Sequence, residues 1–401
     1  MRREPQRGEA ALTRSSFGRF TAPLWLRSAD RRQRTVAVTV GEKLRQREHN
    51  QNGFDTIRLI AAALVLLSHS FPIGAGSNDR EPLSALTGGQ ATFGGLSVGV
   101  FFFISGLLIS NSFDASRSLG SFVRKRALRI MPALIVVCLL LVLVVGPLTT
   151  TLPPGVYFRG AWRFMGQAVF LPTAFSLPGV FADHPIDAVN GSLWSLKFEV
   201  ACYAAAAAFV ALSRGRSALV MGAWIASFVV SRWLNAGAGQ PGALFYIGTM
   251  AGLYRFFGAG VVVYVLRDRV ILSKIAAWVA FALSLIAFAT PFFMEAAATL
   301  GVYALLVFAY ECPQWFRRIT ARGDISYGTY LYAFPIQQLM VPVVGPLPWL
   351  ISAAALPLTL VAAVASWLLV ERPALRLKKN AVPASPIGKG GPDSGVKLPT
   401  W

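Results

Sequence analysis

Between Ile57 and Val370 the sequence is a succession of long apolar runs, each close to 20 residues. About 20 apolar residues in an α-helix cross the hydrocarbon core of a bilayer. Spanning segments are helices or closed barrels, and these runs lack the alternating polarity of barrel strands. Because only 14% of the 401 residues are charged, we predict an all-α, polytopic membrane helix bundle of about ten transmembrane helices.

The basic residues predict the orientation of this bundle. The predicted spans are 57–76, 92–112, 127–147, 192–212, 217–234, 246–266, 275–290, 294–311, 325–344 and 349–370. With a cytoplasmic N-terminus, the inner segments carry Arg117, Arg124, Lys125, Arg126, Arg129, Arg214, Arg216, Arg267, Arg269, Lys274, Arg317, Arg318, Arg322, Arg372, Arg376, Lys378 and Lys379. The opposite side carries only Arg80, Arg159, Arg163, Arg232 and Arg255, with Lys197 near the border. This asymmetry predicts an N-in, C-in topology and explains the net charge of +20 without nucleic acid.

Three regions follow from composition. Residues 1–53 are polar and basic and contain no signal-peptide apolar core, so we expect a disordered cytoplasmic tail; an over-extended gene start is the alternative. Residues 54–376 form the predicted membrane domain, and residues 377–401 a second disordered tail. The three cysteines, Cys138, Cys202 and Cys312, form no paired motif and indicate neither a disulfide nor a zinc site.

Arg58 and His69 are ionisable residues of the first predicted span. Eleven residues at about 100° each make three turns and about 20° more, so both side chains share one helix face, about 16 Å apart along the axis. An ionisable group inside a membrane is costly and usually faces a cavity. Histidine also suits general-base chemistry because its pKa lies near neutrality. His69 is therefore expected to accept the proton of an attacking sugar hydroxyl, or to carry the acyl group as an acyl-imidazole.

The segment Phe122–Pro132 enters the third span with four basic residues. Arg126 and Arg129 are three residues apart and point the same way. Guanidinium groups at the cytoplasmic border match phosphate oxygens bidentately, as a nucleotide-tailed donor such as acyl-CoA would require. Plain positive-inside topology is the alternative explanation, and it suffices for Arg124 and Lys125.

The segment Asn190–Glu199 opens the fourth span from the outer side. Trp194 can stack on a sugar or belong to the aromatic belt, and Ser195 lies beside it near the interface. Glu199 lies about two turns into the predicted helix, where an unpaired carboxylate is costly. We expect Glu199 to orient His69 as the acid member of a dyad.

Weaker signals complete the set of candidates. Residues 98–107 interrupt an aromatic helix with small residues and predict close helix packing. Ser326, Tyr327 and Tyr330 begin the ninth span and are expected to line a cavity. The aromatic and basic segment 157–165 predicts an interfacial or re-entrant helix. Asp183, His184 and Asp187 are outer-loop residues that are expected to be solvated, contact with an acceptor being the alternative.

These residues together resemble the acyltransferase family 3 membrane proteins, which include O-antigen, exopolysaccharide and nodulation-factor acetylases. The resemblance covers about 54–376 and rests on five ordered motifs. They are Arg-x10-His in the first span, Phe-Phe-Ile-Ser-Gly in the second, Arg-x-x-Arg at the third, Trp-Ser-Leu-x-x-Glu with Tyr203 in the fourth, and Ser-Tyr-Gly-x-Tyr-Leu in the ninth. A closing Glu371-Arg372-Pro373 resembles the family's exit from its last helix.

The resemblance implies an enzyme with acyl-CoA as co-substrate and no bound cofactor or metal. It implies a cytoplasmic donor, an outer saccharide acceptor, and a requirement for Arg58 and His69 with support from Arg126, Arg129 and Glu199. The chain departs from the pattern at Ala333, where many relatives carry histidine. It also ends soon after the tenth predicted helix, so we expect no relay to a second catalytic domain within it.

The sequence thus predicts a multi-pass O-acyltransferase of the bacterial inner membrane that acylates, and most commonly acetylates, a surface saccharide. A transporter or flippase of a lipid-linked saccharide, with the buried charges as a proton relay, is the first alternative. A non-catalytic partner of an export complex is the second. The acyl group, the acceptor hydroxyl and the oligomeric state are not readable from the sequence.

Overall fold

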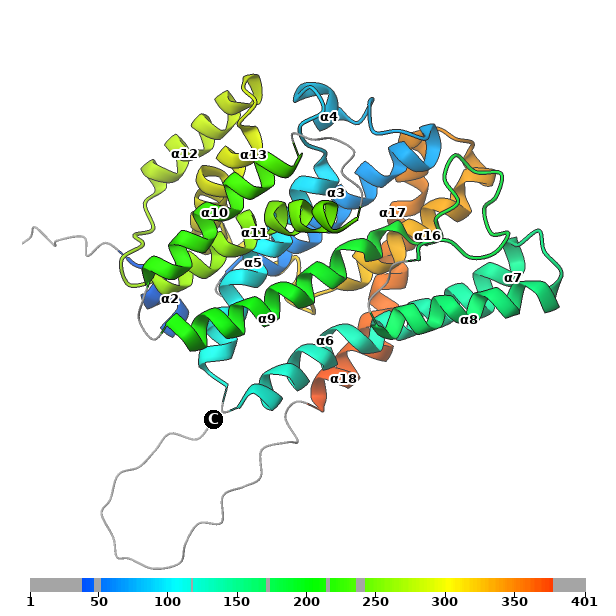
Figure 1. Cartoon of the computed structure of the whole chain (residues 1–401), viewed down its shortest axis with the longest axis horizontal. Helices are drawn as coiled ribbons and strands as arrows, with labels where there is room; N and C mark the ends of the chain where they lie inside the picture. Colours follow the sequence, from blue (N-terminus) through cyan, green and yellow to red (C-terminus); the bar gives the residue numbers. More distant parts are fainter. Residues whose placement is uncertain are drawn as a thin grey trace, which may run out of the picture. The chain divides into compact units, whose positions relative to one another are not determined.

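The computed structural model of the protein describes residues 38–46, 52–116, 118–170, 174–213, 217–235 and 242–377. Within these ranges the chain forms helices joined by turns (Figure 1), and the β-type pairs are three isolated bridges. The all-α prediction is therefore confirmed. Both predicted tails lie almost wholly outside the described residues, as do Arg117, Arg214, Arg216, Lys378 and Lys379.

Seventeen α-helices and five short π- or 3-10-helices make up the described chain. The α-helices are α2 Val40–Arg45, α3 Phe54–Ala75, α4 Pro82–Leu86, α5 Phe93–Asp114, α6 Leu119–Leu140, α7 Gly146–Thr149, α8 Pro154–Phe170, α9 Leu196–Ser213, α10 Ser217–Asn235, α11 Ala243–Val265, α12 Lys274–Ile286, α13 Phe293–Ala296, α14 Val302–Glu311, α15 Gln314–Arg318, α16 Ser326–Val344, α17 Pro348–Ser366 and α18 Arg372–Arg376. The π-helices are η1 Leu141–Val145, η4 Ala297–Gly301 and η5 Trp367–Glu371, and the 3-10 helices are η2 Gly191–Ser195 and η3 Ala287–Ala289.

Seven helical stretches in the described part of the chain are long and apolar enough to cross a membrane. They are Phe54–Ala75, Phe93–Asp114, Leu119–Thr149, Ser217–Leu234, Ala243–Val265, Phe293–Glu311 and Pro348–Arg376. The other three predicted spans, 192–212, 275–290 and 325–344, fall on α9, α12 and α16, which are not among the seven. A helical membrane bundle is therefore confirmed, whereas ten crossings and the N-in, C-in orientation remain predictions.

Small residues bring the central helices close together. Among the seven stretches, α3, α5 and α11 are the most buried inside the bundle, and α10 is the least. A Cβ atom added to Gly106 of α5 would lie 2.1 Å from the Phe257 carbonyl oxygen, and one added to Gly260 of α11 would lie 2.3 Å from that of Phe103. Only glycine permits this approach of two backbones. The packing predicted for the 98–107 segment is confirmed.

The short helix α2 lies within the segment that was expected to be disordered. Thr39 caps it through a capping box with Glu42, and the Gly41 amide donates to the Arg267 carbonyl at 2.8 Å. Arg45 Nη1 donates to Asp268 Oδ1 at 2.6 Å. The expectation of disorder is therefore corrected for residues 39–45, because tertiary contacts with the α11–α12 turn hold a stretch too short to be helical alone.

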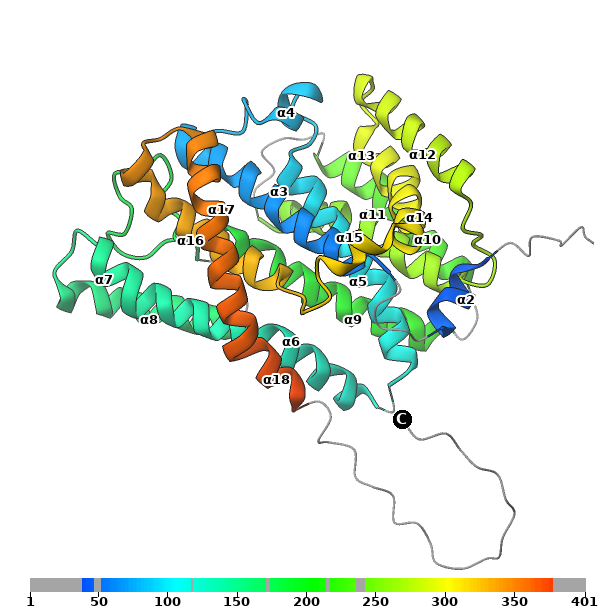
Figure 2. The same cartoon turned by 180° about the vertical axis from the view of Figure 1, so that it is seen from behind.

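Helix α8 contains the aromatic and basic segment 157–165. Its Tyr157 side chain is fully buried, and the hydroxyl donates to the Val142 carbonyl of η1 at 2.8 Å. A Cβ atom on Gly146 would lie 1.8 Å from that hydroxyl, so glycine makes room for the ring. The helix therefore packs along the bundle through this face. Figure 2 shows α8 and α6 on the same side of the bundle from behind.

Candidate active site

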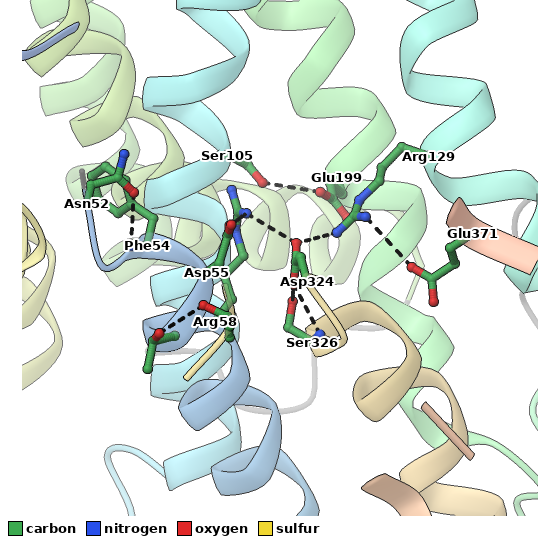
Figure 3. A network of polar contacts seen from close by, with 12 residues as sticks. Asn52, Phe54, Asp55, Arg58, Ser105, Arg129, Glu199, Asp324, Ser326 and Glu371 are labelled. Atoms are coloured by element: carbon green, nitrogen blue, oxygen red, sulfur yellow. Dashed lines mark hydrogen bonds and ion pairs between the residues drawn. The ribbon is translucent and has the colours of Figure 1, made fainter. Parts of the chain in front are cut away.

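Charged side chains from four elements meet at one end of the bundle, here called the arginine end (Figure 3). Asp324, in the turn before α16, presents its Oδ2 atom to two guanidinium groups. Arg58 Nη1 of α3 lies 3.5 Å from this oxygen, and Arg129 Nη2 of α6 contacts it as well. Arg58 Nη1 also pairs with Asp55 Oδ1 at 2.8 Å, and Arg129 Nη1 lies 3.7 Å from Glu371 Oε2. A single carboxylate therefore joins the first and third predicted spans.

Backbone contacts fix the start of α3, and with it Arg58. The Gly53 amide donates to the Ala309 carbonyl at 2.7 Å, and Thr56 Oγ1 donates to the Phe316 carbonyl at 2.8 Å. A Cβ atom on Gly53 would lie 2.7 Å from Cys312 Sγ. The first turn of α3 is therefore tied to α14 and α15, and Arg58 emerges one turn later.

Hydrogen bonds from Ser326 hold the Asp324 carboxylate in position. The Ser326 amide and hydroxyl both donate to Asp324 Oδ1, at 3.1 and 2.5 Å, which leaves Oδ2 for the guanidinium groups. Burial alone would raise the pKa of Asp324, but the positive charges of Arg129 and Arg58 outweigh it and lower that pKa below its ordinary value. Asp324 is therefore ionised at neutral pH and is a permanent partner for both arginines.

Glu199 lies in the first turn of α9 and has two hydroxyl partners. Ser105 Oγ of α5 donates to Glu199 Oε1 at 3.2 Å, and the Tyr203 hydroxyl, one turn further along α9, also donates to Oε1. Spacing of four residues places Tyr203 above Glu199 on one helix face. The carboxylate is thus oriented by its own helix and by the small-residue break of α5.

Arg126 precedes Arg129 on α6 and has unused donors. Its Nη2 atom donates to Ser112 Oγ at 3.4 Å, and within the described part of the chain its buried Nε atom has no hydrogen-bond partner. The carboxylate of Glu199 acts on it electrostatically. A guanidinium group with a buried unpaired N–H is unusual and suits a site that receives a ligand.

His69 lies on α3 among polar and aromatic groups of α16. Its Nδ1 atom is buried and has no hydrogen-bond partner in the ranges described, and its ring meets Phe334 edge-on, with centroids 5.2 Å apart. One turn along α16, Gln337 Nε2 donates to the Leu66 carbonyl at 2.6 Å and to Ser70 Oγ at 2.5 Å. These bonds lock α16 against α3 on both sides of His69 and leave the imidazole free for other chemistry.

The structure does not pair His69 with Glu199. Among the described residues no hydrogen bond or ion pair joins the two side chains, because Glu199 Oε1 accepts from Ser105 and Tyr203 and acts on Arg126. Fold geometry explains the difference. Residues 191–195 form the 3-10 helix η2, so α9 begins only at Leu196, and Glu199 faces α5 and α6. The expected direct dyad is absent from this conformation, and the role of each residue remains a prediction.

The residues that were expected to line a cavity contact neighbouring helices and turns. Ser195 Oγ and the Tyr330 hydroxyl lie 2.9 Å apart, and the latter also donates to the Ser192 carbonyl at 2.5 Å. The Tyr327 hydroxyl donates to the Ile130 carbonyl of α6 at 3.0 Å, while Ser326 holds Asp324. Trp194 packs edge-on against Phe198, with centroids 5.9 Å apart. These side chains join α16 to η2 and α6, and their lining of a cavity remains a prediction.

Three residues of this site were not predicted from the sequence. Glu371 was noted only in a closing motif and Ser105 only within a packing segment, and Asp324 was given no role. The signal for Asp324 was its place two residues before the Ser-Tyr-Gly motif, at the end where the arginines of two spans were predicted to gather. Glu371 is only 2% exposed, and a buried acid at a helix end predicts a cationic partner.

Comparisons with known proteins identify the family of the chain. A family profile described as an acyltransferase domain matches residues 51–368. The chain is 31% identical over 335 residues to an "O-acetyl transferase" of Shigella phage Sf6, covering 81% of this chain and 96% of the relative. It is 28% identical over 363 residues to "Nodulation protein 10" of Rhizobium leguminosarum bv. viciae, covering 83% and 95%. No solved structure matches the chain significantly. The chain therefore belongs to acyltransferase family 3 and is a membrane-bound O-acyltransferase.

Proposed function

We propose that the protein transfers an acyl group, with acetyl favoured, from acyl-CoA on the cytoplasmic side of the bacterial inner membrane to a hydroxyl of an extracytoplasmic saccharide. The observation that carries the proposal is the buried Nδ1 atom of His69, which has no hydrogen-bond partner among the described residues and lies on the same helix as Arg58 of the arginine end. A transferase that spans the bilayer needs a charged site for its donor and, removed from it, a base for its acceptor.

Arg126 and Arg129 are the donor-binding groups in this proposal. They lie on one face of α6, and the unused donors of Arg126 suit the phosphate oxygens of acyl-CoA. Glu199, within electrostatic range of Arg126, holds that guanidinium group in place until the donor binds. The pantetheine arm then extends along α3 toward His69, over the rise of about 16 Å between Arg58 and His69.

His69 acts as general base in the transfer step. The acceptor hydroxyl oxygen attacks the thioester carbonyl carbon while the imidazole takes the hydroxyl proton. The new C–O ester bond forms, the C–S bond breaks, and the proton passes from the imidazolium to the departing CoA thiolate. The imidazole returns to its starting state, so no other reactant is consumed.

Membrane vesicles of defined orientation test the function. Sealed inside-out vesicles given radiolabelled acetyl-CoA, which does not cross bilayers, should transfer label to the enclosed polysaccharide, and right-side-out vesicles should not. His69→Ala should abolish transfer, whereas His49→Ala, a histidine outside the predicted spans, should leave it unchanged. Label that never reaches polysaccharide in either orientation, or full activity in His69→Ala, would refute the proposal.

Two further measurements test donor binding and the route of acyl transfer separately. Arg126→Lys keeps the charge but loses the guanidinium fork, so KM for acetyl-CoA should rise about tenfold. Arg124→Lys is the matched control, because exposed Arg124 has one hydrogen bond within the described ranges, to the Leu377 carbonyl at 3.4 Å. Incubation with labelled acetyl-CoA and no acceptor should leave the protein unlabelled; a labelled histidine would establish the acyl-imidazole route instead.

A further inference from the structure

The loop between α8 and α9 forms an open pocket, here called the cavity, with a volume of about 510 Å³ that the proposed chemistry does not use. Eight residues between Leu177 and Asp187 line it, and its side-chain polar groups are His184 and Asp187. Its volume falls within the range of about 300 to 1,000 Å³ that is typical of small-molecule sites. The cavity contains no lysine or arginine in its lining, so it does not suit an anion.

Backbone bonds build this loop into one conformation. Two isolated β-bridges cross it, Thr150 with Val180 and Ser176 with Ala188. The His184 amide donates to the Phe181 carbonyl at 3.0 Å, and Phe181 has a φ of 54°, which non-glycine residues rarely adopt. Such a conformation persists only where its surroundings enforce it, and it often marks a binding site.

A buried glutamine of α16 clamps the loop. Gln338 Nε2 donates to the carbonyl oxygens of Ile186 and Ala188, at 2.9 and 2.7 Å, and Gln338 Oε1 lies 2.8 Å from His184 Nδ1. Figures 1 and 2 both show the loop beside α16. A side-chain amide within an apolar bundle is costly unless it is satisfied, and here all of its bonds hold the cavity wall.

The same bonds determine the tautomer of His184. Both Gln338 Nε2 contacts are carbonyl oxygens, which only accept, so the amide orientation is set and Oε1 faces the imidazole. An amide oxygen also only accepts, so His184 Nδ1 carries the proton that it shares with Gln338. In the neutral ring Nε2 is then an acceptor. With the exposed carboxylate of Asp187, the cavity offers two acceptors for hydroxyl donors.

Helix α16 contacts the arginine end at Ser326, His69 at Phe334 and the cavity loop at Gln338. Gln338 is twelve residues beyond Ser326 on α16, a rise of about 18 Å from the residue that holds Asp324. Phe334, one turn before Gln338, is the residue whose ring meets His69 at a centroid distance of 5.2 Å. The short path from His69 through Phe334 and Gln338 to His184 therefore leads from the proposed base to the cavity.

We propose that this cavity binds a sugar unit of the acceptor, next to the unit whose hydroxyl is acylated, with His184 Nε2 and Asp187 accepting its hydroxyl protons. A neutral saccharide fits because its hydroxyls are donors and the cavity supplies acceptors without a cation. The inference rests on the proposed function and adds an acceptor-specificity site to it. Asp183, four residues before Asp187 and equally exposed, does not line the cavity.

Acceptor kinetics test this site. The probe is surface polysaccharide of the native host, freed of esters by mild alkali, with radiolabelled acetyl-CoA as donor and detergent-solubilised full-length protein. Asp187→Asn and His184→Ala should each raise KM for the polysaccharide about tenfold, since the first replaces a charged acceptor with a weaker neutral one and the second removes the imidazole acceptor. Both should keep kcat and the KM for acetyl-CoA within twofold. Asp183→Asn should behave as wild type.

The outcomes separate this inference from the function on which it rests. If wild type transfers no label, the proposed function fails. If wild type is active and Asp187→Asn and His184→Ala keep the wild-type KM for polysaccharide, the acceptor site is wrong. A fall in kcat with unchanged acceptor KM would also overturn it, because the residues would then act on chemistry. Should His184→Ala fail to fold, the exposed Asp187→Asn variant decides.

Discussion

The substitution Asp324→Asn removes the charge that joins Arg58 to Arg129 while keeping the shape of the side chain. The introduced side chain is expected to keep the bond from the Ser326 amide, since its carbonyl oxygen accepts as the carboxylate Oδ1 does. The two guanidinium groups would lose their shared anion. We expect a protein that folds but that no longer holds the arginine end in the geometry that acyl-CoA requires.

The size of the effect follows from the remaining contacts. Removing one partner of a buried ion pair costs about 3 to 5 kcal/mol. Here Arg58 keeps Asp55 at 2.8 Å and Arg129 keeps Glu371 at 3.7 Å, so neither cation is stranded and the loss should be about 2 to 3 kcal/mol. At about 2 °C per kcal/mol for a large chain, the melting temperature should fall by roughly 4 to 6 °C. Misplaced guanidinium groups should lower kcat/KM for acetyl-CoA about 10- to 100-fold.

Two assays measure these effects. Cys138, Cys202 and Cys312 are free and buried, so a thiol-reactive fluorophore reports their exposure as the protein unfolds on heating. Initial rates against acetyl-CoA concentration, at saturating polysaccharide, provide kcat/KM. Asp268→Asn is the matched control, because Asp268 also pairs with an arginine, Arg45 at 2.6 Å, but at an exposed site.

The control should match wild type in both assays. Wild-type kcat/KM in Asp324→Asn would refute the claim that Asp324 positions the arginines for the donor. A melting temperature lowered by more than about 15 °C would refute the reasoning on residual partners, because it would mean that Asp55 and Glu371 do not compensate.

Three further predictions concern pH, helix packing and the hydroxyl partner of Glu199. Because the pKa of Asp324 is lowered in the folded protein, its carboxylate contributes its full stabilisation above about pH 4 and loses it as the pH falls below that value. The melting temperatures of wild type and Asp324→Asn should therefore converge only below about pH 4. Gly106→Ala puts a Cβ atom 2.1 Å from a carbonyl oxygen of α11 and should lower stability by about 1 to 3 kcal/mol. Gly120→Ala is the control, because open space surrounds Gly120, and it should not lower stability. Thermal unfolding of the two variants tests the difference. Tyr203→Phe removes one donor to Glu199 and should reduce kcat/KM several-fold without unfolding the protein, and an unchanged value would exclude the hydroxyl from the site.

Helical periodicity predicted the parts of the site that lie on one helix. The shared face of Arg58 and His69 requires only that residues 54–75 be continuous, and they are. The same holds for Arg126 and Arg129 on α6. The contact of Tyr203 with Glu199 could also be predicted from the sequence, since the two are four residues apart, a spacing that brings side chains together on any helix.

Contacts between helices could not be predicted from the sequence in the same way. The depth of Glu199 depends on where α9 begins, and the 3-10 turn η2 moves that start to Leu196. Which carboxylate meets Arg129 depends on how α16 and η5 pack against α6, and hydropathy does not specify packing. Ala333, where the family resemblance led us to expect histidine, is fully buried with Leu66 and Ala355, so that position here serves packing.

The sharing of Asp324 between Arg58 and Arg129 also sets an order of events during synthesis. Arg58 and Asp324 are 266 residues apart in sequence. At roughly 5 to 20 residues per second, about 13 to 53 s separate the emergence of the two from the ribosome. Over that interval Asp55, three residues from Arg58, is the local counter-ion that travels with it into the translocation machinery. The long-range bond can therefore form only after eight of the ten predicted spans have been synthesised.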